Sequence, residues 1–362
     1  MIGAGAIGLL SARLLAETGV QVQVLEQRQV GSEASWAGGG IISPLSPWEA
    51  PAAVTALSSW SQSAYRELAP RLAADSGIDP ELHATGLYWL DLPDEELPLR
   101  WAAAQRVSMD RVGEDALRAA VPVLGPGYRR ALHIAGVANI RNPRLLRALK
   151  ADLQRLSNVE IQEECTVTSL VQSGGRLVGV RTADGIQTAD QVVLCAGAWS
   201  GELLRSCGLE LPVEPVKGQM ILYKCAPDFL SAMVMANGRY AIPRRDGHVL
   251  VGSTLERVGF DKIPTEKALR SLRESAEHLL PALAEQPVVR HWAGLRPGSP
   301  DGIPFIGPVP GIEGLWLNCG HYRNGLVMAP ASCHLLVDLM LGREPIVDPA
   351  PYAPAARLRP LA

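Results

Sequence analysis

Three glycines near the start of the chain, Gly3, Gly5 and Gly8, have the spacing G-x-G-x-x-G. Glu26 follows at the end of an alternating Val-Gln-Val-Gln-Val run. In a strand–helix–strand unit, the first glycine permits a tight turn, the second admits phosphate oxygens, and the third lets the helix pack closely. The helix N-terminus then offers free N–H groups to a pyrophosphate, and the acid accepts hydrogen bonds from a ribose. Glycines also mark ordinary turns, but the helix, strand and acid that follow favour a dinucleotide site.

Two further small-residue segments bear on which dinucleotide binds. The run Gly38-Gly39-Gly40 indicates backbone lying against a large, flat group. The segment Leu194-Cys-Ala-Gly-Ala-Trp199 resembles the second flavin motif of FAD-dependent oxidoreductases, although a core strand followed by a turn would look similar. NAD and FAD both fit the first unit, and these two segments favour FAD.

The elements that position these residues follow from the apolar periodicity. We expect a helix over 6–18, a strand over 20–26 and one strand over 160–170. A helix over 142–156 is expected to have Asn142 as its N-cap, followed by Pro143. Only Met1 and Ile2 precede Gly3, where a buried strand of about five residues is expected. We therefore expect that Met1 is an internal methionine or a start assigned too late, or that the chain is truncated.

Composition limits the class of protein. The chain has 362 residues, of which 47% are hydrophobic and 20% charged, as in an ordinary globular enzyme large enough for two domains. The net charge of −3 gives no reason to expect nucleic acid as a partner. The six cysteines form no C-x-x-C pair, so we expect no metal site and a reducing compartment. Without a basic leader or a long apolar run, the sequence predicts a cytoplasmic protein with no integral membrane association.

Four further segments lie along the chain, and with the first glycine run they make up a resemblance that extends from residue 2 to about residue 344. They begin at Ser35 (SWAGGGIISP), Tyr240 (YAIPR), His291 (HWAGLRPGSPDG) and Gly320 (GHYRNG). Together they resemble the glycine oxidase family, the thiamine-biosynthesis branch of the D-amino-acid oxidase family. The resemblance implies a mixed α/β (α+β) fold, with a Rossmann-like FAD-binding domain and a discontinuous second domain built on an antiparallel sheet. The implied boundaries are 1–80, 140–210 and 293–350 for the FAD-binding domain, 81–139 and 211–292 for the substrate-binding domain, and 351–362 for a loose tail.

The same resemblance implies roles for individual residues. Arg296 would hold the substrate carboxylate in a planar, two-point grip that lysine cannot reproduce. Tyr240 would add a hydroxyl hydrogen bond, and Arg323 would lie on the substrate side or in the flavin loop. We expect no catalytic base, and we expect backbone contact to the flavin rather than proton shuttling from His321. The expected residues of a noncovalent FAD site are Gly3, Gly5, Ala6, Ile7, Gly8, Glu26, Gln27, Gly38, Gly39, Gly40, Val167, Ala196, Gly197, His321, Tyr322, Arg323, Asn324, Gly325, Leu326 and Val327.

The implied reaction is oxidative deamination of glycine or another small amino acid. Hydride transfer from the neutral amine to flavin N5 gives an imine that hydrolyses to glyoxylate and ammonia, and oxygen is reduced to hydrogen peroxide. In a thiamine pathway the imine would pass to the thiazole-forming enzyme. An oxidase or dehydrogenase for sarcosine, D-proline or another D-amino acid stays open, with Leu255 and Met220 as expected pocket residues. A noncatalytic flavin module and an NAD(P) dehydrogenase are less consistent with the later segments, and a homo-oligomer is left open.

Overall fold

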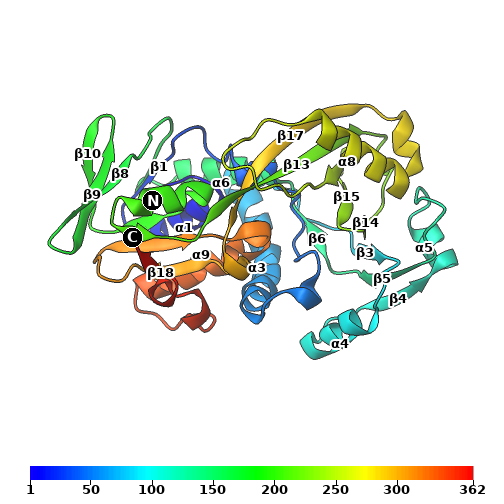
Figure 1. Ribbon diagram of the computed structural model, residues 1–362, viewed down its shortest axis with the longest axis horizontal. Coiled ribbons are helices and arrows are strands. Elements are labelled where there is room, and N and C mark those ends of the chain that lie inside the picture. Colours follow the sequence, from blue (N-terminus) through cyan, green and yellow to red (C-terminus); the bar gives the residue numbers. More distant parts are fainter. Residues whose placement is uncertain (362) are drawn as a thin grey trace.

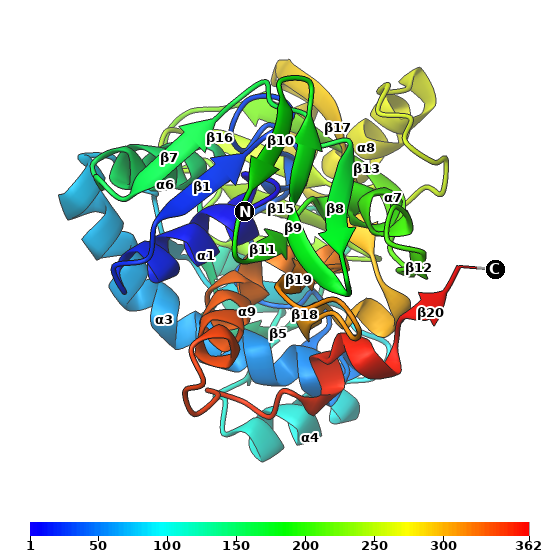
Figure 2. The same ribbon diagram turned by 90° about the vertical axis from the view of Figure 1, so that its left-hand side faces the viewer.

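The computed structural model describes residues 1–361, which form two lobes side by side (Figure 1). The first, the parallel-sheet lobe, contains strands in the order β7, β1, β11, β19, β18, with Ile2 bridging β1 and β11. Its β1–β7 and β11–β19 pairs are parallel, and helices α1, α3 and α9 pack together beside this sheet (Figure 2). The bounds are β1 (Val22–Leu25), β7 (Val159–Gln162), β11 (Val192–Leu194), β18 (Phe305–Pro308), β19 (Leu315–Cys319), α1 (Ala6–Ala16), α3 (Ala52–Ser76), α6 (Asn142–Gln154) and α9 (Gly325–Met340).

The second, the eight-stranded lobe, is a mixed and mostly antiparallel sheet in the order β17-β13-β16-β15-β14-β3-β5-β4. The mixed fold class expected from the sequence is confirmed. The bounds are β3 (Leu87–Leu90), β4 (Asp110–Gly113), β5 (Arg130–Ile134), β13 (Glu214–Lys224), β14 (Met233–Ala236), β15 (Arg239–Pro243), β16 (His248–Gly252), β17 (Val288–Gly298), α4 (Glu96–Gln105), α5 (Glu114–Ala120) and α8 (Glu266–Leu279).

Smaller elements complete the two lobes. A three-stranded meander of β8, β9 and β10 projects beside the parallel sheet (Figure 2). The remaining bounds are α2 (Ala34–Ala37), α7 (Ser200–Arg205), β2 (His83–Ala84), β6 (Ala138–Asn139), β8 (Ser169–Ser173), β9 (Arg176–Thr182), β10 (Gly185–Thr188), β12 (Leu209–Glu210) and β20 (Arg359–Pro360).

The long β13–β17 ribbon joins the lobes (Figure 1). Gly218 of β13 lies opposite Gly294 of β17, and each glycine leaves room for a neighbour. A Cβ atom at Gly218 would lie 2.0 Å from Nη1 of Arg296, and one at Gly294 would lie 2.4 Å from the Cβ of Ala37 in α2. Because paired residues of an antiparallel ribbon share a face, the two glycines admit Arg296 and helix α2 against the same face of the ribbon.

Ile2 occupies the place of a central strand. Its N–H donates to Val193 O at 2.9 Å, and its carbonyl accepts from Cys195 N at 2.9 Å. Gly3 N donates to Leu25 O at 2.8 Å on the other side. The glycine run thus begins directly from a two-sided backbone bridge, although only two residues precede it.

Three sequence expectations differ from the structure. Asn142 is the first helical residue of α6 and not its N-cap, because its Nδ2 donates instead to Ser35 O at 2.7 Å. The strand expected over 160–170 breaks into β7 and β8, since Glu164 has a φ of 56° and the chain turns there. The tail expected to be loose is anchored at points within residues 351–361: Tyr352 is buried, its hydroxyl donates to Ala53 O, and β20 pairs with β12. Residue 362 lies outside the described residues.

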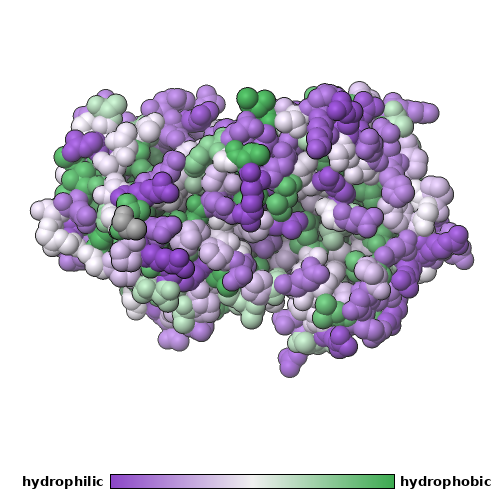
Figure 3. Space-filling model, viewed as in Figure 1, coloured by the Kyte–Doolittle hydropathy of each residue, from purple (hydrophilic) through white to green (hydrophobic). Residues whose placement is uncertain are grey.

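The surface in the view of Figure 3 is mixed, with apolar side chains scattered among polar ones. Within residues 1–361, no helix combines the length and the apolar character needed to cross a membrane.

Candidate active site

One cavity, of about 400 Å³, lies at the carboxyl ends of the parallel strands and reaches the β13–β17 ribbon. It is lined by every residue predicted from the sequence to bind FAD except Gly8, and by Arg296 and Tyr240. A Cβ atom at Gly8 would lie 1.9 Å from Gly3 O, so this glycine lets α1 pack against the bridge at Ile2. The structure therefore brings together segments that are up to about 320 residues apart in the sequence.

The N-terminus of α1 opens into this cavity. Gly5 is its N-cap, the first turn has no acidic residue, and Ala6 N donates to Ser35 Oγ at 3.0 Å. The buried Glu26 accepts from Ala4 N at 2.8 Å and from Arg28 N at 3.0 Å. Burial raises the pKa of Glu26, while the two N–H donors oppose the shift. A positive helix end beside a carboxylate suits a pyrophosphate and its ribose.

The glycine loop of residues 38–40 lines the same cavity and is held from behind. Gly40 has a φ of 79°, and a Cβ atom there would lie 2.1 Å from Ile140 O. Ile140 N donates to Gly40 O at 2.8 Å. Arg244 Nη2 donates to Gly39 O at 2.7 Å. The loop is therefore fixed by backbone and side chain from both lobes.

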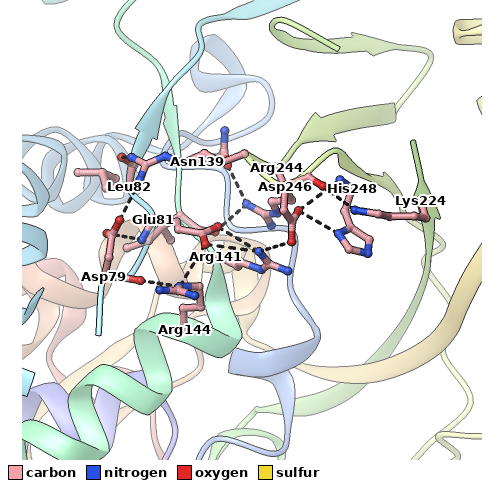
Figure 4. Close-up of polar contacts among 12 residues, drawn as sticks. Asp79, Glu81, Leu82, Asn139, Arg141, Arg144, Lys224, Arg244, Asp246 and His248 are labelled. Atoms are coloured by element: carbon pink, nitrogen blue, oxygen red, sulfur yellow. Dashed lines mark hydrogen bonds and ion pairs between the residues drawn. The ribbon is translucent and has the colours of Figure 1, made fainter. Parts of the chain in front are cut away.

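Arg244 lies in a polar cluster behind this loop (Figure 4). Its Nη1 donates to Asn139 Oδ1 at 2.7 Å and to Ile140 O at 3.0 Å. Nearby, Arg141 lies between Glu81 and Asp246, at 3.2 and 2.8 Å. Burial lowers the pKa of Arg244 to about 10, so the guanidinium stays charged at neutral pH. A buried cation thus connects β15 to the glycine loop.

Replacing Arg244 with methionine is expected to lower the free energy of unfolding by about 3 kcal/mol, because three buried acceptors lose their donor. The matched control is Arg245→Met. Arg245 pairs with Asp79 at 2.8 Å on the surface, and its loss should cost less than about 1 kcal/mol. Urea unfolding of both variants checks the prediction. Equal decreases in the free energy of unfolding of the two variants would show that Arg244 does not anchor the glycine loop.

Arg296 projects from β17 into the far part of the cavity. Its Nη2 donates to Ser253 Oγ at 2.8 Å and its Nη1 to Thr254 O at 3.2 Å. Tyr240 on β15 lies beside it, and both line the cavity. Burial, with a smaller contribution from Arg323, lowers the pKa of Arg296. The cation has no carboxylate within ion-pairing distance in the described part of the chain, so it is available to an acidic ligand.

His321 and the N-terminus of α9 close the remaining side of the cavity. The His321 ring is buried, and its Nε2 has no hydrogen-bond partner among residues 1–361. Burial lowers its pKa to about 3, so the imidazole is neutral at physiological pH. The first turn of α9 contains no acid, which leaves its positive end facing the cavity.

The lowered pKa of His321 predicts a pH dependence of stability. In the unfolded chain a histidine has a pKa of about 6.5. Between that pH and about 3, the unfolded state therefore binds more protons than the folded state, and the free energy of unfolding falls as the pH falls. His321→Asn should reduce this slope between pH 4.5 and 6 by up to about 1.4 kcal/mol per pH unit. The control His278→Asn changes an exposed ring and should leave the slope intact. Urea unfolding at several pH values measures both, and an unchanged slope in His321→Asn would contradict the prediction.

Several cavity residues were not found from the sequence. Ser35 caps α1, Asn142 holds the segment before the glycine loop, and Ser253 contacts Arg296. They lie on three separate segments, and no local spacing marks them. The expectation for Leu255 and Met220 was wrong: Leu255 is exposed, Met220 is buried in the sheet core, and neither lines the cavity.

The comparisons with known proteins agree with this geometry. The family model described as FAD dependent oxidoreductase matches residues 1–339, and the chain belongs to that family. It is 64% identical to a glycine oxidase of Pseudomonas putida, over 99% of this chain and 98% of the relative. It is 33% identical to a bifunctional protein ThiO/ThiG of Synechocystis, over 95% of this chain and 51% of that protein. The crystal structure of glycine oxidase from Geobacillus kaustophilus superimposes with a TM-score of 0.91 at 28% identity, covering 97% of this chain and 96% of the other.

Proposed function

We propose that this chain is an oxidase that converts glycine, oxygen and water to glyoxylate, ammonia and hydrogen peroxide. The observation that carries the proposal is the position of Arg296, which has no carboxylate partner among residues 1–361 and lies beside Tyr240 in a cavity suited to a dinucleotide. The high identity to a protein named glycine oxidase supports the choice of substrate.

In this proposal the two ends of the cavity have separate tasks. The α1 N-terminus and Glu26 hold the pyrophosphate and ribose of FAD, and the glycine loop of residues 38–40 bounds the flavin. Bound FAD supplies hydride acceptance and reaction with oxygen. Arg296 grips the substrate carboxylate, and Tyr240 adds a hydroxyl donor, so that the α-carbon is oriented. The positive end of α9 favours negative charge that develops beside it.

No side chain is assigned as a base. His321, the one histidine lining the cavity in residues 1–361, is neutral, and its deep burial disfavours the imidazolium that proton abstraction would produce. The substrate therefore reacts as its neutral amine. Burial also raises the pKa of Cys319 to about 12, so its thiol stays protonated, which supports a noncovalent cofactor.

A peroxide assay with glycine, sarcosine, D-alanine and D-proline tests the substrate. We expect glycine to give peroxide, glyoxylate and ammonia in equal amounts. Turnover of the other compounds with none for glycine would instead identify a related amine oxidase. Dye reduction without peroxide would identify a dehydrogenase.

We further propose that the imine product is handed to a thiazole-forming partner. The bifunctional relative, whose name joins ThiO to ThiG, supports this link because this chain matches about half of it. If the imine is transferred, adding the partner should lower the free glyoxylate formed per peroxide. An unchanged ratio would refute the transfer.

A further inference from the structure

The segment between β16 and α8, residues 254–265, crosses from the eight-stranded lobe to the parallel-sheet lobe, and we call it the strap. Its base is fixed to β13. Lys217 exchanges backbone hydrogen bonds with Glu256 at 2.9 and 3.0 Å. The Lys217 side chain is 1% exposed, and its Nζ reaches Asp261 Oδ2 at 2.8 Å and Ile263 O at 2.5 Å. The buried Lys217 thus binds the strap on both sides of Phe260: its backbone pairs with Glu256, and its side chain holds Asp261 and Ile263.

The tip of the strap contacts the other lobe at two places. Lys262 Nζ lies 2.7 and 2.9 Å from the carboxylate oxygens of Glu33. The Phe260 ring lies 5.5 Å from the ring of Trp199, and Lys262 Nζ lies 6.0 Å from the same ring. These contacts connect the strap to the segment before α2 and to the turn after β11.

Both contacted residues line the cavity. Glu33 lies next to Ser35, which caps α1, and Trp199 follows Ala196 and Gly197, which are predicted to contact FAD. Lys262 and Phe260 belong to the eight-stranded lobe, so their contacts tie that lobe to two separate cavity-lining segments of the parallel-sheet lobe.

The tip of the strap is weakly held compared with its base. Ile263 is 73% exposed, Val258 45% and Phe260 39%, so little apolar surface is buried here. The Lys262–Glu33 pair is partly solvated. Segments with few buried contacts open at lower free energy than the rest of a fold. The side chains of Phe260 and Lys262 can therefore release Trp199 and Glu33 while Lys217 still holds Asp261 and Ile263.

We propose that the strap is a clasp that retains FAD, with Lys262 and Phe260 as the residues that keep it closed. The inference rests on the proposed placement of FAD in this cavity. Because Glu33 and Trp199 are cavity walls, the cofactor leaves after the tip releases them. Salt weakens the Lys262–Glu33 pair and should therefore accelerate release.

The test is the rate at which FAD dissociates from the holoenzyme, followed by the fluorescence of the released flavin after dilution. The double variant Phe260→Ala/Lys262→Met should release FAD about tenfold faster, since it loses both an ion pair and an aromatic contact. Lys262→Arg keeps the charge and should stay within twofold of the parent. Ile263→Ala, which removes an exposed side chain from the same strap, should also stay within twofold. Raising the salt concentration should accelerate release from the parent but much less from the double variant.

Two results would overturn the clasp. The first is a dissociation rate in the double variant within twofold of the parent, in a protein that still binds FAD and is reduced by glycine. That outcome removes the clasp and leaves the proposed function standing. The second is a purified protein with no affinity for FAD, which removes both.

Discussion

Replacing Arg296 with methionine is expected to lower kcat/KM for glycine by about a hundredfold, which corresponds to roughly 3 kcal/mol. The guanidinium is partly buried, is held by Ser253 and Thr254, and faces the cavity without a carboxylate partner in the described residues. A glycine substrate has no side chain, so its carboxylate supplies much of its binding. Losing the charged contact should therefore raise KM and lower kcat through poorer orientation. Steady-state kinetics with peroxide detection measure both.

Two controls separate this effect from general damage. Arg290→Met removes an arginine from the same strand, where its guanidinium lies over the Trp36 ring at 4.4 Å, and kcat/KM should stay within about fivefold of the parent. The flavin content of Arg296→Met should match the parent. A loss of kcat/KM below threefold, in a variant that still binds FAD, would show that Arg296 does not hold the substrate carboxylate.

Gly8→Ala is expected to weaken FAD binding at least tenfold and to lower the free energy of unfolding by about 1–3 kcal/mol. The added Cβ would lie 1.9 Å from Gly3 O, and a backbone atom cannot rotate away as a side chain could, so α1 must move away from the Ile2 bridge. That displacement moves the N-terminal N–H groups that face the cavity. Flavin fluorescence titration and urea unfolding measure the two effects.

Gly136→Ala is the matched control, because a Cβ atom there has no neighbour within 4 Å in the described structure. It should leave both FAD affinity and stability close to those of the parent. Parent-like FAD affinity in Gly8→Ala would show that close packing of α1 is not needed for the site.

The parts of the site that could be predicted from the sequence carry strong local signals. The G-x-G-x-x-G spacing located the α1 N-terminus, because helix, strand and acid follow at fixed offsets. Arg296 and Tyr240 were found through segments that resemble a known family, and the structure places both in the cavity. The positions of these residues could be predicted because the spacing and residue types that mark them lie within short stretches of the sequence.

The remaining contacts depend on long-range geometry. Asn142 has the residue type and position of a helix cap, yet its amide serves Ser35, which is 107 residues away in the chain. Arg244 lies in a segment that was noted for its neighbour Tyr240, and its bond to Gly39 O exists only because β15 reaches the other lobe. The hydrogen-bond partner of a polar side chain depends on which groups lie near it in the folded structure, and local sequence propensity does not contain that information.

The same reason explains the misplaced strand and tail. Residues 160–170 alternate like one strand, but Glu163 accepts from Val30 N at 2.7 Å and the chain turns to bring Val167 to the cavity. The Pro- and Ala-rich tail has a composition typical of loose segments. Its Tyr352 nevertheless fills a site against α3, and Arg357 donates to Ile303 O and Pro304 O.

The most direct test of the central claim is anaerobic titration of the purified protein with glycine, followed by the flavin absorbance near ~450 nm. We predict that the parent carries FAD and that glycine bleaches it fully. We predict also that the same concentrations bleach Arg296→Met far less, although it carries as much FAD. A protein whose flavin is unaffected by saturating glycine, or one that binds no flavin, would contradict the account.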